Sequence, residues 1–262
     1  MTAAVVAALG LGAVIGVLLG VFGGGGSILA VPALVYGVGL PLSAAVPTSL
    51  LVVGISSAVA VLPRLRARQV RWRIAAVVGT VGAAAALGGT AVNRLLDPRV
   101  VLLGFAVVMI IAGARMLRDD DHAGGDCALP GSEVNWRSCL PKSIGVGVVV
   151  GFLTGLFGVG GGFLIIPALV VLLGLPAPVA TGTSLVVIVL NSAAGFAAHI
   201  GEVELDYSLA GAFALAAVVG ALAAGHLAIR LPADRLRRGF AYLVFAVAVF
   251  VAVQVLINPA TA

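Results

Sequence analysis

The sequence predicts an all-α polytopic membrane protein made of two inverted-topology repeats, each a broken helical hairpin followed by three transmembrane helices. Of its 262 residues, 61% are hydrophobic and only 10% are charged, whereas a soluble domain carries about 25% charged residues. The glycine-rich segment Gly20–Ser27 recurs as Gly155–Gly162, each time inside an apolar run. The net charge of +5 comes mostly from arginines in short loops. Such charges report orientation in a membrane, so we expect no nucleic-acid partner.

Apolar segments set the element map, at about 20 residues per full span. In the first repeat, residues 1–117, we expect a helix at 3–22, the glycine break, a short helix at 27–40, and helices at 42–62, 74–92 and 100–117. Residues 118–142 form a polar linker. The second repeat, residues 143–262, restarts the pattern with helices at 143–157, 162–175, 178–198, 207–229 and 239–257.

The restart is an internal duplication. In the alignment that places Gly12 on Gly147 and Val35 on Val170, which we call the repeat alignment, more than half of the paired residues are identical. Further on, the same alignment places Thr48-Ser49 on Thr183-Ser184. Low-complexity composition does not easily place both glycine ladders, both prolines and both Thr-Ser pairs in one register, which favours duplication.

Loop charges indicate that the two halves are inverted. The loop Arg64–Arg73 carries five arginines and is expected in the cytoplasm. Its counterpart, His199–Asp206, has three acidic residues and no Lys or Arg. Inversion needs an odd number of crossings per half, so each glycine break is predicted as a hairpin with its tip near the bilayer centre. Both termini then lie outside and the linker inside. The alternative is one kinked span in place of each hairpin, giving four crossings per half.

The glycine breaks are the candidate substrate site. Irregular backbone at membrane depth occurs where protein buries it or a watery cavity lines it. Helices that begin there have free N–H groups and a partial positive charge, and so favour anions. We therefore expect Gly25, Gly26 and Ser27 to meet Gly160, Gly161 and Gly162 around an anion. The alternative is that these glycines only allow tight helix packing. Packing is also our interpretation of two four-residue ladders, Gly12-Gly16-Gly20 and Gly147-Gly151-Gly155.

Two polar clusters supply candidate hydroxyl donors. Thr48 and Ser49 follow Pro47 in one helix, and Thr183 and Ser184 occupy the aligned positions in the other. These hydroxyls can donate to an oxyanion without placing a charge in the membrane. Alternatively, each bonds a carbonyl of its own helix, as Ser and Thr often do. Asn191 is a weaker candidate for lining the site.

Other functional classes lack their residues. No Asp, Glu, Lys or Arg is expected well inside an apolar segment, so a carboxylate proton relay is not predicted. His226 is interpreted as a packing or interfacial residue. Paired carboxylates, zinc ligands and a placed Ser/His dyad are missing, which argues against an enzyme. The acidic and cysteine residues of the linker match no zinc spacing, so we expect no metal, no cofactor and reduced thiols.

The duplicated motif resembles a known family. Gly-x-x-x-Gly-x-Phe-Gly-x-Gly-Gly followed by Pro-Ala-Leu runs from Gly16 to Leu34 and from Gly151 to Leu169, with the Thr-Ser pairs after each copy. This pattern is similar to that of the TauE/SafE family of sulfite and organosulfonate exporters. The resemblance implies a secondary transporter that exports a small sulfur-containing anion, such as sulfite or sulfoacetate, across a prokaryotic inner membrane by alternating access.

Two other functions stay open from the sequence. The same helix ends could line a passive anion-selective channel, or the same fold could move a different small anion. The sequence does not fix the direction of transport, the coupling ion or the oligomeric state.

Overall fold

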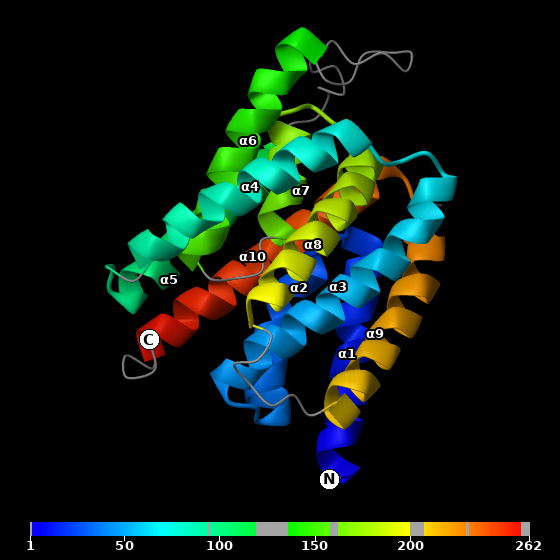
Figure 1. Ribbon diagram of the computed structural model, residues 1–262, viewed down its shortest axis with the longest axis vertical. Coiled ribbons are helices and arrows are strands. Elements are labelled where there is room, and N and C mark those ends of the chain that lie inside the picture. Colours follow the sequence, from blue (N-terminus) through cyan, green and yellow to red (C-terminus); the bar gives the residue numbers. More distant parts are fainter. Residues whose placement is uncertain are drawn as a thin grey trace.

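The computed structural model describes residues 2–93, 95–118, 136–157, 162–199, 207–228 and 231–257, and all regular secondary structure in these ranges is helical (Figure 1). In chain order the elements are α1 (Thr2–Phe22), the 3-10 turn η1 (Gly24–Gly26), α2 (Ser27–Pro32), the π-helical η2 (Ala33–Val38), α3 (Leu42–Arg66), α4 (Trp72–Asn93), α5 (Pro98–Arg118), α6 (Trp136–Phe157), α7 (Gly162–Val171), α8 (Ala177–His199), α9 (Tyr207–Ala228) and α10 (Ala233–Ile257). Among them, α3, α4, α6, α8 and α9 are long and apolar enough to cross a membrane.

Several predicted boundaries are wrong, among them the start of α10, which lies at Ala233 and not at 239. Helix α3 continues through Pro63 to Arg66, because a proline near a helix end removes one hydrogen bond without stopping the helix. Helix α6 begins at Trp136, so residues 136–142 are helical and not part of the linker. Its 22 residues correspond to about 33 Å. The helix before the second break is therefore longer than the 143–157 segment that the sequence predicted. Reduced thiols were also expected, but Cys139, which lies in the first turn of α6, is disulfide-bonded.

The first break turns the chain back along α1, as the hairpin prediction requires. A Cβ on Gly26, just after the break, would overlap the backbone of Ile15 and the side chain of Leu19 in α1. Farther along, a Cβ on Gly37 would overlap the side chain of Leu11. Positions progressively later in the returning segment therefore face progressively earlier positions in α1.

The helical segments that follow the two breaks, which end at Val38 and Val171, have the same cap. Gly39 has φ 83° and Gly174 has φ 67°, values that glycine adopts without strain. The N–H of the following leucine bonds the carbonyl six residues earlier: Leu40 to Leu34 at 3.0 Å, and Leu175 to Leu169 at 3.1 Å. A Schellman cap reaches back five residues, so each of these caps is one residue longer. The repeat alignment pairs Gly39 with Gly174, Leu40 with Leu175 and Leu34 with Leu169.

The glycine ladders are packing surfaces, as predicted, and they pair helices from different halves of the chain. In α1, the ladder contacts α9 through Gly12 with Phe213, Gly16 with Ala217, and Gly20 with Ala221. In α6, it contacts α4 through Gly147 with Val78, Gly151 with Gly82, and Gly155 with Ala86. Residue numbers rise together in both pairs, so the two helices of each pair run parallel, as Figure 1 shows. Small residues allow this close backbone approach.

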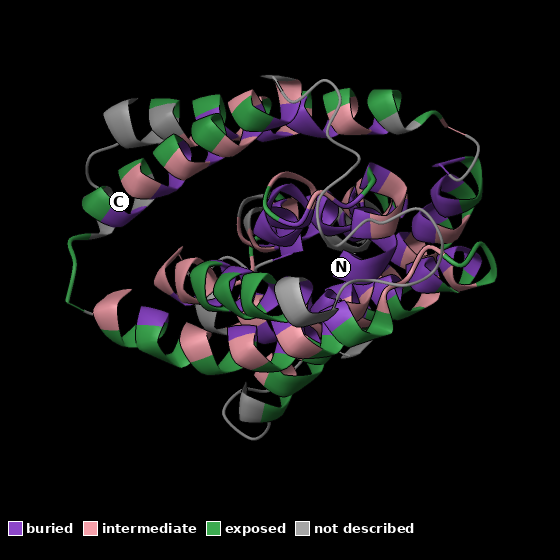
Figure 2. Cartoon of the chain, turned by 90° about the horizontal axis from the view of Figure 1, so that it is seen from above, coloured by how far each residue is buried: buried purple, intermediate pink, exposed green. Residues whose placement is uncertain are grey.

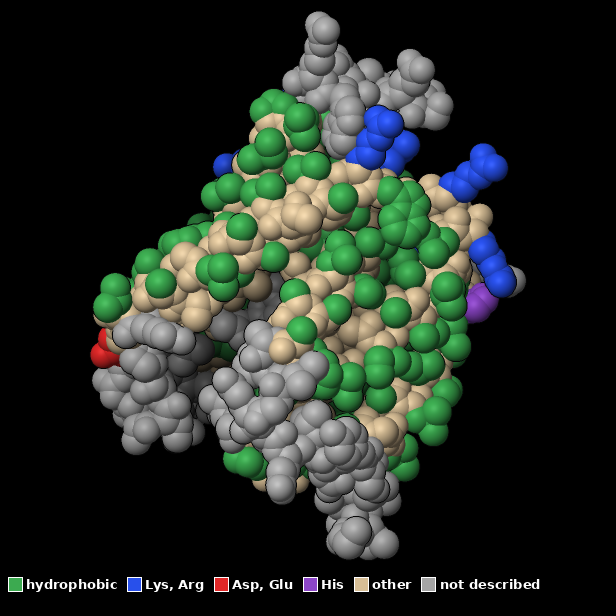
Figure 3. Space-filling model, in the orientation of Figure 1, with side chains coloured by type: hydrophobic (Ala, Val, Ile, Leu, Met, Phe, Trp, Pro, Cys, Tyr) green, Lys and Arg blue, Asp and Glu red, His purple; other side chains and the backbone are tan. Residues whose placement is uncertain are grey.

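Arginines gather at one end of the molecule and apolar side chains cover its sides. The end of α3 lies beside the start of α8, where Gly182 contacts the carbonyl of Gln69. Figure 3 shows the Lys and Arg side chains at this end, which we call the arginine end. Exposed leucines such as Leu87 (76% exposed) and Leu215 (64%) stand on the helix flanks, while Figure 2 shows buried residues concentrated where helices face one another. Exposed apolar flanks of this extent suit a lipid surface.

Candidate functional site

The first break is a tight, fully buried turn. Helix α1 ends at Phe22, and Gly23 follows with φ 71° and ψ −99°, a conformation that side chains other than glycine rarely adopt. Gly24–Gly26 then form the 3-10 turn before α2 begins at Ser27. The Ser27 hydroxyl donates to the Gly24 carbonyl at 2.7 Å. Residues from Gly23 to Ser27 are all buried, so the turn belongs to the protein interior.

The second break meets the first. Helix α6 ends at Phe157 and α7 begins at Gly162, while the predicted site residues Gly160 and Gly161 lie outside the described residues. A Cβ on Gly24 would overlap the carbonyl of Gly162, and a Cβ on Gly162 would lie 2.7 Å from the Ser27 hydroxyl oxygen. The structure therefore brings together two predicted residues, Ser27 and Gly162, with Gly24 as the direct backbone contact, while Gly26 packs against Ile15 and Leu19 of α1.

Helix α8 places the Thr181 methyl group and the Ser184 hydroxyl against the first break. A Cβ on Gly23 would lie 2.7 Å from the Thr181 methyl carbon and 3.1 Å from the Ser184 hydroxyl oxygen. Ser184 was among the predicted site residues, and Thr181 was not. The signal for Thr181 was its spacing, because residues three apart share one face of a helix. Both residues are buried.

Four hydroxyls in and beside the two Thr-Ser pairs bond carbonyls of their own helices. Thr48 donates to the Ala44 carbonyl at 2.7 Å, and Ser49 to that of Val46 at 2.7 Å. In the second cluster, Thr181 donates to the Ala177 carbonyl at 2.8 Å, and Ser184 to that of Thr181 at 2.8 Å. This is the alternative arrangement that the sequence allowed. Each hydroxyl must rotate away from its carbonyl before its proton can reach an anion.

Thr183 faces away from the break. Its hydroxyl oxygen accepts a hydrogen bond from the backbone N–H of Arg71 at 3.1 Å, just before α4 begins at Trp72. The neighbouring Gly182 lies against the Gln69 carbonyl. The structure thus places Thr183 at the connection between α3 and α4.

Three buried side-chain oxygens on α3 and α8 have no hydrogen-bond partner among the described residues. They are the hydroxyl oxygens of Ser56 and Ser57 and the Oδ1 of Asn191. The two helices cross where a Cβ on Gly54 would lie 3.1 Å from the Cβ of Ser192. The repeat alignment pairs Ser56 with Asn191 and Ser57 with Ser192. Unlike the Thr-Ser clusters, these atoms are not engaged by their own helices.

Arg64 was predicted to lie in a loop, but it belongs to the last turn of α3. Its side chain is completely buried in the last turns of α3. Nη2 donates to the carbonyls of Gly20 at 3.2 Å and Val21 at 3.1 Å, at the end of α1, and Nη1 donates to Gln69 Oε1 at 3.3 Å. The missed signal was helical spacing: the buried residues Ser57 and Ala60 precede Arg64 by seven and four positions on one face.

His226 stands outside this arrangement. It is exposed on α9, and its Nδ1 lies 2.9 Å from the Leu222 carbonyl one turn earlier in the same helix. This position agrees with the predicted interfacial role.

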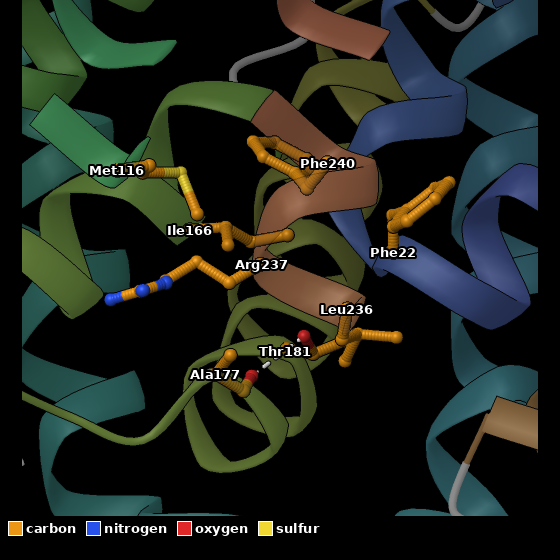
Figure 4. A pocket seen from close by; sticks show the side chains of 8 residues that line it. All are labelled: Phe22, Met116, Ile166, Ala177, Thr181, Leu236, Arg237 and Phe240. Atoms are coloured by element: carbon orange, nitrogen blue, oxygen red, sulfur yellow. Dashed lines mark hydrogen bonds between the residues drawn. The ribbon is translucent and has the colours of Figure 1, made fainter. Parts of the chain in front are cut away.

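A small pocket lies between the first break and the arginine end. It is a narrow depression, partly open to solvent, with no room for a water molecule. Figure 4 shows its lining, which is Phe22, Met116, Ile166, Ala177, Thr181, Leu236, Arg237 and Phe240. Two of these residues, Phe22 and Thr181, also adjoin Gly23. Phe22 and Thr181 therefore lie between the pocket and the first break.

Comparisons with known proteins agree on one family. Residues 8–251 match the family described as "Sulfite exporter TauE/SafE". A probable membrane transporter protein of Xylella fastidiosa (strain Temecula1) is 33% identical over 252 residues, covering 93% of each chain. Probable membrane transporter proteins of Methanocaldococcus jannaschii (29% identical; 72% of this chain and 70% of the relative) and Bacillus subtilis (YunE, 27%; 76% and 80%) also match. No solved structure matches the chain. The chain belongs to the TauE/SafE family and is a multi-pass membrane transporter protein of the cell membrane.

Proposed function

We propose that the protein is a secondary exporter of a small sulfur-containing anion, such as sulfite or an organosulfonate like sulfoacetate, working by alternating access. The observation that carries this proposal is the contact between the two breaks, Gly24 against Gly162 with Ser27 beside them. The proposed site comprises the two helix starts and the hydroxyls and amide of α3 and α8, namely Gly25, Gly26, Ser27, Gly160, Gly161, Gly162, Thr48, Ser49, Thr181, Ser184 and Asn191. Thr183, which was predicted with them, is left out because its hydroxyl accepts the Arg71 N–H.

The electrostatics of the breaks favour an anion. Helical backbone begins again at Ser27 and at Gly162, and the first N–H groups of a helix carry a partial positive charge. These starts lie side by side in a buried setting, where electrostatic interactions are stronger than in water. Glycine in both breaks allows an anion to approach the backbone N–H groups.

Several features support an inverted arrangement of the two halves. The ladder of α1 packs on α9 in the same way that the ladder of α6 packs on α4, and the repeat alignment pairs the glycines of one ladder with those of the other. In Figure 1, α1 and α6 run in opposite directions, as do α3 and α8. Paired inverted repeats with broken helices at their interface are typical of secondary transporters, whose substrate binds where the repeats meet.

The burial of the breaks supports a carrier over a passive channel. An open channel needs a continuous aqueous path, but Gly23 to Ser27 and Gly162 are all buried.

Transport by purified protein in liposomes tests the proposal. We expect saturable flux of radiolabelled sulfite or sulfoacetate that unlabelled anion on the opposite side accelerates, with sulfate and taurine as comparison solutes. A lack of flux of every tested anion above protein-free liposomes would refute the proposal. Flux that does not saturate and shows no trans-acceleration would replace the carrier with a channel.

A further inference from the structure

Arg64 is the one fully buried ionised side chain in the described ranges of the chain. Its hydrogen-bond partners are two backbone carbonyls and the Gln69 side chain, all of them uncharged. Its Nε is buried and has no hydrogen-bond partner within those ranges. A buried cation without a carboxylate is strongly unfavourable, and an ionisable residue within a transmembrane segment marks a functional site by default.

The position of Arg64 connects it to the first break. The carbonyls that it bonds, those of Gly20 and Val21, belong to the last turn of α1, where the negative end of the helix dipole lies. Gly23 lies two residues beyond Val21. A Cβ on Gly23 would lie 2.7 Å from the Thr181 methyl carbon and 3.1 Å from the Ser184 hydroxyl oxygen. The guanidinium is therefore anchored at the margin of the proposed site.

The three guanidinium nitrogens have different partners. Nη1 and Nη2 hold Gln69 and the end of α1, which fixes the plane of the group. Nε has a single N–H, and it is the nitrogen without a partner. Lysine could not divide these tasks, because its charge is a single compact centre without a rigid fork.

We infer that Arg64 is a further substrate-binding residue, whose Nε–H donates to an oxygen of the transported anion and whose charge balances it at the first break. This inference rests on the proposed function, because it requires an anionic substrate. It adds a formal positive charge to a site that otherwise consists of backbone N–H groups, hydroxyls and an amide.

The test compares Arg64→Gln, Arg64→Lys and Arg66→Gln in the liposome assay with sulfite. Arg66 is exposed in the same turn of α3, so its variant is a matched control for lost charge. We expect the KM for sulfite to rise by about tenfold or more in Arg64→Gln, the usual effect of removing a charged hydrogen bond. Arg64→Lys should restore part of the affinity, and Arg66→Gln should resemble wild type.

The outcomes separate this inference from the proposed function. Wild-type protein that moves no tested anion overturns both. Wild-type transport combined with an unchanged KM in Arg64→Gln overturns the inference alone. If Arg64→Gln does not fold, Arg64→Lys is tested by the increase in melting temperature that sulfite produces. A smaller increase than in wild type supports the inference, and an equal increase overturns it.

Discussion

Gly24 in the first glycine break packs directly on the carbonyl of Gly162 in the second, so closely that a Cβ on Gly24 would overlap it. The neighbouring contact joins Gly162 to the Ser27 hydroxyl. Two segments separated by more than half the chain therefore share one backbone interface, and the first prediction below follows directly from its geometry.

Gly24→Ala should abolish transport and lower the melting temperature. The added methyl group cannot be accommodated by a side-chain rotation, because the atom it meets is backbone, and overpacking of this kind costs about 1–3 kcal/mol or more. Gly10→Ala is the matched control in α1, since a Cβ there has nothing within 4 Å. Normal transport and stability in Gly24→Ala would show that the two breaks do not touch.

Gly151→Ala should destabilise the protein by separating α6 from α4. A methyl group at this position overlaps the backbone of Gly82, so the helices must move apart and lose contacts along the ladder, at an expected cost of about 1–3 kcal/mol. The measurement is thermal unfolding in detergent. Gly145→Ala lies in the same helix with open space around its Cβ, and it should unfold at or above the wild-type temperature.

Ser184→Ala and Thr183→Val should have different effects. Ser184 faces the first break, so its loss should raise the KM for sulfite with little change in stability. Thr183 accepts the Arg71 N–H, and leaving that donor unpaired should cost about 1–3 kcal/mol of stability while KM changes less. A raised KM at wild-type stability in Thr183→Val would instead place Thr183 at the substrate.

The proposed inversion predicts which loops a membrane-impermeant thiol reagent reaches. In a protein with both native cysteines replaced by serine, Arg66→Cys at the arginine end should react only from the cytoplasm. Pro232→Cys, exposed between α9 and α10, should also react only from the cytoplasm. Labelling of the two from opposite sides would contradict the inversion and favour one kinked span in place of each hairpin.

The sequence was sufficient for features that depend on local pattern. Most helix starts, the two breaks, and the packing role of Gly16 and Gly151 all follow from hydropathy, glycine content and four-residue spacing. The sequence was insufficient where tertiary contacts determine whether a side chain is buried and which way it faces. Arg64 looked like a loop arginine after Pro63, but its contacts with the end of α1 make it interior. Thr183 and Ser184 are adjacent in sequence, and the helical rotation between them sends only Ser184 to the break.

The most direct test of the central claim is a cryo-electron microscopy structure of the protein in lipid nanodiscs with sulfite bound. The account predicts density for the anion within hydrogen-bond distance of the backbone between Gly24 and Ser27 and of Gly162. Density at another site, with this interface unchanged and empty of anion, would contradict it.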